Sequence, residues 1–238
     1  MSNTLDQILL NLKKIEEMNL LITQQDLTET IRRLQTWQTN RLLTTHDDLW
    51  NSKRFKPTMQ FFADELYGPK DFSERDIELT RAAPKMAKVV PNKALKSLKI
   101  ALRLNCLSLE LDIALVQKLG NEDINRNTYF DCYRQSGSQS QREEQIQLLE
   151  KLSLDLPKVV KIPGMSVILR LSRKPAKVAG VGTLHAFLEQ GFNAFKKIGD
   201  VNDFIDPVIS REKEMMHALF TAKGQAENPL PQMDNPTA

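Results

Sequence analysis

The stretch NKALKSLKIALRLNCLSLELDIALVQKLG, residues 92–120, is the longest helical pattern in this chain. Pro91-Asn92 opens it, and Gly120 supplies the residue that commonly ends a helix. A helix that is apolar on two sides must be covered by protein on both. The stretch therefore predicts a central helix around which the rest of the chain packs. Its apolar residues form two stripes at helical spacing, Leu95, Leu98, Leu102, Leu109, Ile113 and Val116 in one and Leu104, Leu107, Leu111 and Leu115 in the other.

The segments on either side of this stretch also repeat their apolar residues at helical spacing, and none alternates with the period of a strand. The scarcity of glycine, 9 in 238 residues, argues against a turn-rich β fold. We expect an all-α protein, a single compact multi-helix bundle of about ten helices. Its domain spans residues 1–222, and residues 223–238, rich in proline and polar residues, are expected to form a disordered tail. The other expected helices are 5–15, 27–49, 55–66, 73–90, a short one around Tyr129 and Tyr133, 138–160, 165–171, 175–198 and 202–222.

Cysteine usage and the absence of targeting signals indicate where the protein works. Cys106 and Cys132 are too few for a disulfide framework, and Cys106 lies within an apolar helical pattern. The first residues lack a secretory signal, and no apolar run approaches the ~20 residues of a transmembrane helix. We expect a soluble cytoplasmic protein with no transmembrane segment.

The distribution of charge is the best indication of function. Residues 79–109 and 156–188 contain thirteen lysines and arginines and no acid, whereas the whole chain is only +3. If both stretches fold onto one side, they give the protein a basic face that its net charge conceals. The cations are Arg81, Lys85, Lys88, Lys93, Lys96, Lys99, Arg103, Lys158, Lys161, Arg170, Arg173, Lys174 and Lys177.

Two groups within these stretches are the candidate anion-binding residues. Lys96, Lys99 and Arg103 form a stripe on the central helix. Arg170, Arg173, Lys174 and Lys177 bracket an expected turn between two apolar helices, where helix N-termini would add positive potential. The apolar residues beside this second group also fit a helix lying on a membrane surface. The alternatives are a solvated helix face for the first group and a buried short helix with basic ends for the second.

Two histidine–glutamate pairs have spacings found in metal sites. Glu214 and His217 have the Glu-x-x-His spacing of carboxylate-bridged metal bundles, but the chain has no second such pair. His185 and Glu189 are one helical turn apart, which could place two ligands beside a metal or make an ordinary surface pair. The chain has no nucleophile elbow, phosphate-binding loop or dinucleotide fingerprint. We therefore expect no cofactor and no catalysis, and keep a helical-bundle enzyme or metal carrier using these pairs as the alternative.

A tight corner is predicted around FFADELYGPKDFSERD, residues 61–76. Gly68 is expected in the left-handed conformation that ends a helix, and Ser73 with Asp76 resembles a capping box. We expect Glu65, Arg75 and Asp76 to form an ion pair that fixes the corner. The alternative is a pocket in which Tyr67 works with these charges.

The same segment, with FLEQGFNAF at residues 187–195, resembles an uncharacterised bacterial family, the FFLEE-BY-PAD proteins. Ala63 and Asp64 depart from the Leu-Glu of that name. The resemblance covers most of the chain and implies an all-α bacterial protein, with no activity to carry over.

Taken together, the sequence predicts a non-catalytic interaction protein whose basic face binds an anionic partner. That partner would be an acidic protein, an anionic lipid surface or nucleic acid phosphate. Few aromatic residues accompany the cations and no recognition helix stands out, so sequence-specific DNA binding is not expected. The oligomeric state is left open, a homo-oligomer included.

Overall fold

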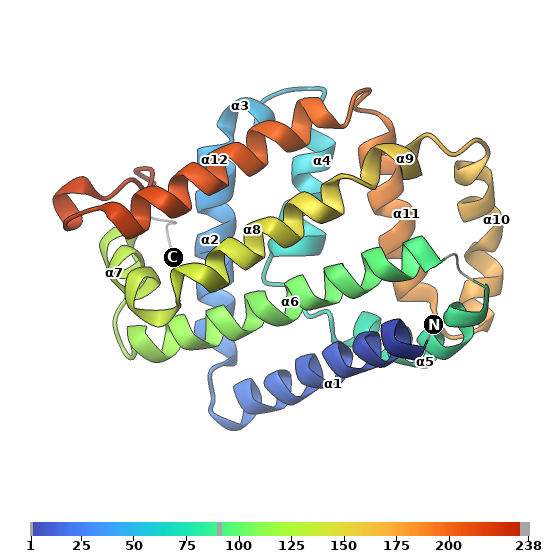
Figure 1. Cartoon of the computed structure of the whole chain (residues 1–238), viewed down its shortest axis with the longest axis horizontal. Coiled ribbons are helices and arrows are strands. Elements are labelled where there is room, and N and C mark those ends of the chain that lie inside the picture. The colour runs from blue at the N-terminus through green and yellow to red at the C-terminus, as the bar shows by residue number, and fades with distance from the viewer. Residues whose placement is uncertain (1, 90–91, 234–238) are drawn as a thin grey trace.

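The computed structural model describes residues 2–89 and 92–233, and over these residues it is helical with no strand, as the sequence predicted. Helices α1 (Ser2–Gln24), α6 (Asn92–Leu119), α8 (Gln139–Ser153) and α12 (Asn202–Thr221) form one layer along the long axis (Figure 1). A second layer, crossing the first steeply, contains α2 (Thr28–Thr45), α4 (Lys56–Phe61), α11 (Gly182–Lys196) and α10 (Met165–Val178). Helices α5 (Ser73–Val89) and α7 (Arg126–Ser136) lie at opposite ends of the molecule (Figure 1).

The central position predicted for residues 92–120 is confirmed. Leu102 and Cys106 of α6 pack with α1 and α5, and Leu107 and Leu111 pack toward α8. The last turns of the helix, including Leu115, join α2, α7 and α12 in the largest apolar cluster. One helix thus contributes to three separate parts of the core, which is what its two apolar stripes require.

The starts of α7 and α8 are fixed by local sequence. The Asn125 side chain accepts hydrogen bonds from the backbone N–H groups of Asn127 and Thr128 and begins α7. Ser138 and Gln141 form a reciprocal capping box at the start of α8. Such caps satisfy N–H groups that have no partner inside the helix.

Several expected helices are divided differently from the prediction. The segment 27–49 breaks at His46 into α2 and α3 (Asp47–Trp50), and 55–66 becomes α4 followed by a π-helix, η1 (Phe62–Tyr67). The segment 138–160 separates into α8 and α9 (Leu156–Val160), because Pro157 has no N–H to donate to the carbonyl of Ser153, the last residue of α8. No described helix is both long and apolar enough to span a bilayer.

The folded part of the chain continues beyond the predicted boundary at residue 222. After a short 3-10 turn, η2 (Gln225–Glu227), Leu230 is buried against α7 and α12. Arg126 Nε donates to the carbonyl of Leu230 at 2.8 Å, and Asn228 is also buried. Residues 223–233 therefore pack on the bundle, and residues 234–238 of the predicted tail lie outside the described part.

Candidate functional site

Helix α10 is the most exposed long element at the basic end of the molecule (Figure 1). None of its residues is buried, and its packing is mainly against α11. Gly164 precedes it at φ +77° and Gly180 follows it at φ +69°, so both ends turn at left-handed positions that favour glycine. The helix thus lies on the outside of the bundle, covered on one side.

The exposed side of α10 carries large apolar residues. Leu171 is 72% exposed and Val178 is 91% exposed, and both Val167 and Ile168 are more than half exposed. Val167, Leu171 and Val178 recur at spacings that place them on one helix face. These side chains make an apolar stripe that no part of the described chain covers, and we call them, with Ile168, the α10 stripe.

Three cations lie on the adjoining face of the same helix. Arg170, Lys174 and Lys177 are spaced one turn apart, exposed, and engaged in no ion pair within the described residues. We call these three residues the α10 cations. The sequence prediction of a turn between two helices is wrong here, because Pro175 lies inside α10. The helix tolerates it since the carbonyl that loses a partner belongs to Leu171, where water has access.

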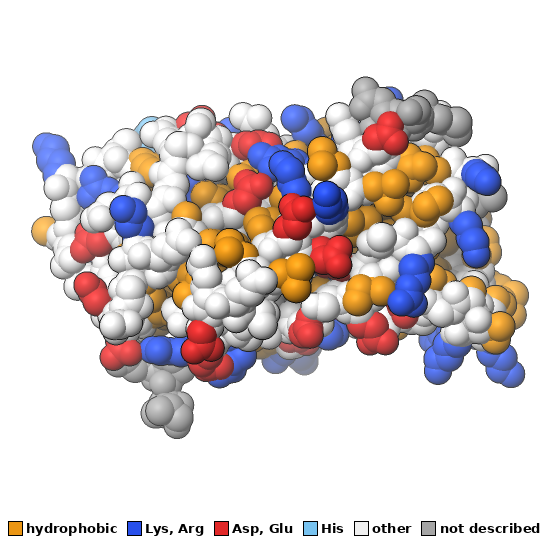
Figure 2. All heavy atoms as spheres, turned by 90° about the horizontal axis from the view of Figure 1, so that it is seen from below, with side chains coloured by type: hydrophobic (Ala, Val, Ile, Leu, Met, Phe, Trp, Pro, Cys, Tyr) orange, Lys and Arg blue, Asp and Glu red, His pale blue; other side chains and the backbone are white. Residues whose placement is uncertain are grey.

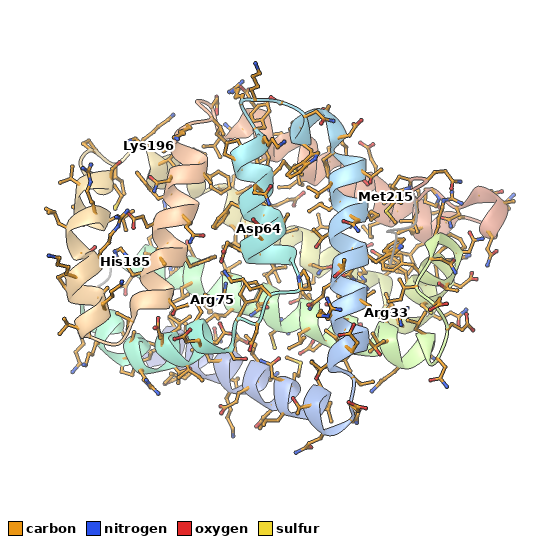
Figure 3. The ribbon with its side chains drawn as sticks, turned by 180° about the vertical axis from the view of Figure 1, so that it is seen from behind. Arg33, Asp64, Arg75, His185, Lys196 and Met215 are labelled. Carbon is orange, nitrogen blue, oxygen red and sulfur yellow. The ribbon has the colours of Figure 1, made fainter. Side chains whose placement is uncertain are left out.

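The fourth predicted cation of this group has a structural role. Arg173 forms a bidentate pair with Glu189 of α11, at 2.6 and 2.7 Å. Beside it Ser172 Oγ lies 2.9 Å from His185 Nε2, and Lys196 Nζ donates to Ser166 Oγ at 2.7 Å. Figure 3 labels His185 and Lys196 on α11. Of the alternative metal ligands, His185 and Glu189 therefore hold α10 against α11.

The helix N-terminus expected to attract an anion at this end is already occupied. The buried carboxylate of Glu78, from α5, accepts from the backbone N–H of Thr183 at 3.1 Å and of Leu184 at 2.7 Å. Both belong to the first turn of α11, where N–H groups have no partner inside the helix. At this end the cations of α10, and not the N-terminus of α11, therefore supply positive potential.

The second candidate group is divided by the fold. Arg103 makes a bidentate pair with Glu144 of α8 at 2.9 and 3.0 Å, so its charge is neutralised at the partly exposed contact between α6 and α8. Lys96 is exposed and Lys99 is half-buried, and neither forms an ion pair in the described structure.

The two basic stretches meet at one end of the molecule. Lys93 of α6 and Lys158 of α9 both contact Asp155, at 3.2 and 3.5 Å. Figure 2 shows Lys and Arg side chains with hydrophobic ones at the end where α5 and α10 lie. Four of the thirteen cations pair with acids from outside the stretches, and the other nine have no such pair within the described residues. The nine are Arg81, Lys85, Lys88, Lys96, Lys99, Lys161, Arg170, Lys174 and Lys177.

The predicted corner forms, with different partners. Arg75 contacts the Asp76 carboxylate at 3.4 Å and donates to the carbonyl of Glu65, while the Glu65 carboxylate pairs with Lys70 at 2.6 Å. Burial raises the pKa of Asp76 against the lowering effect of Arg75. The Tyr67 side chain lies outside the described part. The Arg75 guanidinium packs over the rings of Phe72 and Phe187, and Figure 3 shows it beyond the end of α4.

Glycine at the corner is required by contact and not by a left-handed conformation. Gly68 has φ −72°, and a Cβ there would lie 2.2 Å from the carbonyl oxygen of Ala63. The expected capping box is also replaced, since Asp71 Oδ1 accepts from the N–H of Ser73. The Asp71 carboxylate therefore satisfies the first N–H group of α5.

The segment 187–195 packs directly on this corner. The ring of Phe61 lies 5.6 Å from that of Phe187 and 6.4 Å from that of Phe195. A Cβ on Gly191 would come within 2.8 Å of the Phe61 ring. The two segments behind the family resemblance thus form one aromatic contact between α4 and α11.

The other candidate metal pair faces solvent. Glu214 and His217 are exposed on α12, and Glu214 accepts a hydrogen bond from Ser210 at 2.9 Å. Among the residues that the structure describes, no three His, Cys, Asp or Glu side chains come together as metal ligands.

A buried ionic cluster that the sequence did not predict lies between α2 and α12. His46 is fully buried, and its Nε2 lies 3.0 Å from Glu212 Oε1, which also accepts from Arg41 at 2.5 Å. Burial by itself raises the pKa of Glu212, but the charge of Arg41 and the hydrogen bonds from both partners lower it to about 2. The partners are more than 160 residues apart, so no local spacing could have indicated the cluster.

Residues 19–226 match the model of a family described as a domain of unknown function, DUF8198, and the chain belongs to that family. The match extends from within α1 to the turn that follows α12. No curated protein and no solved structure matches the chain.

Proposed function

We propose that this protein functions by binding an anionic partner through the end of the molecule that carries α10. The observation behind the proposal is that the α10 cations point into solvent from a helix supported on one side only. The four cations of α10 and Glu189 sum to +3, since Arg173 alone is paired. Unpaired cations of one sign raise the local concentration of anionic partners and speed their association.

The lysines of α5 and α6 extend this potential. Lys85 and Lys88 are exposed, and α5 ends near the lower end of α10 in both ribbon views (Figures 1 and 3). Glu78, the acid of α5 nearest to α11, is buried in the helix cap and contributes little to the surface. An anion approaching this end therefore meets several cations from different helices.

The test is salt-dependent retention on heparin. A variant with Arg170, Lys174 and Lys177 changed to Gln is expected to elute at clearly lower salt, because contacts with a polyanion weaken as cations are removed. Arg173 stays unchanged, since its loss would also loosen α10 from α11.

A matched control removes the same charge elsewhere. Lys14 of α1, Lys53 before α4 and Lys118 near the end of α6 are exposed and have no ion pair in the described structure, and their triple Gln variant is expected to elute close to the unmodified protein. Equal elution of the two triple variants would show that net charge, and not α10, sets the retention, and would refute the proposal.

The relation to the FFLEE-BY-PAD proteins, a bacterial origin and a cytoplasmic location are likewise proposals. The first two are supported by the corner segment, with Tyr67-Gly68-Pro69, and its aromatic contact with 187–195. A cytoplasmic location is supported by the two buried cysteines, which are both free thiols. A binding role without catalysis agrees with the use of His185 and Glu189 in helix packing.

A further inference from the structure

We infer that the anionic partner is the surface of a lipid bilayer, in which α10 lies along the interface. This inference rests on the proposed function and adds the class of partner. It starts from the two outward faces of α10, one apolar and one cationic, described above.

The arrangement on α10 is that of a helix lying in a membrane interface. Such helices place an apolar face at the boundary between headgroups and acyl chains and keep lysines and arginines on the polar side. The α10 stripe and the α10 cations adjoin on the half of the helix that faces away from α11. Both faces can therefore contact one planar surface at the same time.

The three classes of anionic partner differ in whether they would cover the α10 stripe. Nucleic acid phosphate would engage the cations and leave Leu171 and Val178 in water, and the cations have few aromatic neighbours for base stacking. An acidic protein would need a groove shaped for the stripe. An anionic bilayer supplies hydrocarbon and negative charge together, with no need for shape complementarity.

Other exposed apolar and cationic residues lie on the segments next to α10. Ile162, just before the helix, and Leu188 on α11 are exposed apolar residues, and Lys161 is an exposed cation with no ion pair in the described structure. The bond between Arg173 and Glu189 fixes the orientation of α10 on the bundle. The helix can therefore dock while α11 keeps it attached.

The first experiment compares sedimentation with phosphatidylcholine vesicles and with vesicles that also contain phosphatidylglycerol. The unmodified protein is expected to sediment with the anionic vesicles only. A variant with Leu171→Ser and Val178→Ser keeps every charge, and both positions are exposed, so the fold is retained. Its vesicle affinity is expected to fall by about tenfold or more, because the variant has less apolar surface to transfer from water into the bilayer.

Heparin separates failure of this inference from failure of the proposed function. Normal retention on heparin without vesicle binding would overturn the lipid assignment and leave a soluble polyanion as the partner. Equal vesicle binding by the Leu171→Ser, Val178→Ser variant and the unmodified protein would also overturn it. Loss of α10-dependent retention on heparin as well would refute the proposed function itself.

A second readout places the helix in the interface directly. A Leu171→Cys variant labelled with a polarity-sensitive fluorophore is expected to shift to the blue on anionic vesicles. Labelling is selective, since Cys106 and Cys132 are buried and burial raises the pKa of both thiols, that of Cys106 to about 11. A label at exposed Gln117 serves as control, and equal spectra at the two positions would contradict docking through α10.

Discussion

Changing Glu212 to Gln tests whether the buried ionic cluster stabilises the bundle. The Glu212 side chain is 17% exposed, and its carboxylate contacts both the Arg41 guanidinium and the His46 ring. A pKa lowered from 4.5 to about 2 corresponds to roughly 3 kcal/mol of favourable interaction, at about 1.4 kcal/mol per unit. Removing one partner of a buried pair costs ~3–5 kcal/mol, a large share of the ~5–15 kcal/mol that stabilises a typical domain.

Urea unfolding followed by circular dichroism at pH 7 measures this cost. We expect Glu212→Gln to lower the free energy of unfolding by ~3 kcal/mol. Glu29→Gln is the control, because Glu29 pairs with Arg32 on an exposed surface and its loss should leave the midpoint unchanged. A midpoint for Glu212→Gln within error of this control would refute the reasoning.

The pH dependence gives the same cluster a second test. The pKa of Glu212 is lower in the folded than in the unfolded protein, so its stabilisation is complete above 4.5 and is lost as pH falls toward 2. The difference in unfolding free energy between the unmodified protein and Glu212→Gln should therefore shrink over this window. An equal difference at pH 7 and at pH 2 would show that the carboxylate charge is not its source.

Three further predictions concern contacts seen in the fold. Gly68→Ala is expected to cost ~2 kcal/mol or more, because its Cβ would meet backbone at 2.2 Å; an unchanged thermal midpoint would contradict this. Gly191→Ala should cost ~1 kcal/mol in urea unfolding, since the ring it displaces, that of Phe61, is confined in the aromatic cluster, whereas a gain would show that the ring can move aside. Glu78→Ala should cost ~1–2 kcal/mol and speed hydrogen exchange at the start of α11, and unchanged exchange there would rule out the cap.

The helices that the sequence predicted well are those whose apolar spacing and end signals lie within the helix itself. The long pattern of 92–120 is visible in the sequence because both its stripes are apolar, and α12 begins and ends near the predicted residues. The errors arise where distant residues decide. Gly68 follows the end of a helix, as a left-handed glycine would, yet the approach of the Ala63 carbonyl is what requires it.

In the candidate site, too, some features follow from local sequence and others depend on distant residues. Its cations could be predicted because two stretches of the sequence contain no acid, so no cation in them can pair with a neighbour in the same stretch. The sequence could not predict which cations stay unpaired, because Arg103 and Arg173 pair with glutamates of other helices, Glu144 and Glu189. Partners this far apart in the chain leave no spacing to read.

An amphipathic pattern alone does not say which side of a helix faces the protein, and α10 shows why this matters. The apolar face of α12 is buried through Phe204 and Leu219, as the pattern suggests. Helix α10 has an equally clear pattern, but it attaches to α11 through hydrogen bonds and an ion pair of Ser172 and Arg173, leaving Leu171 outside. Since exposed apolar surface is unfavourable in water, the proposed docking on a bilayer would give the α10 stripe the cover that the described chain does not provide.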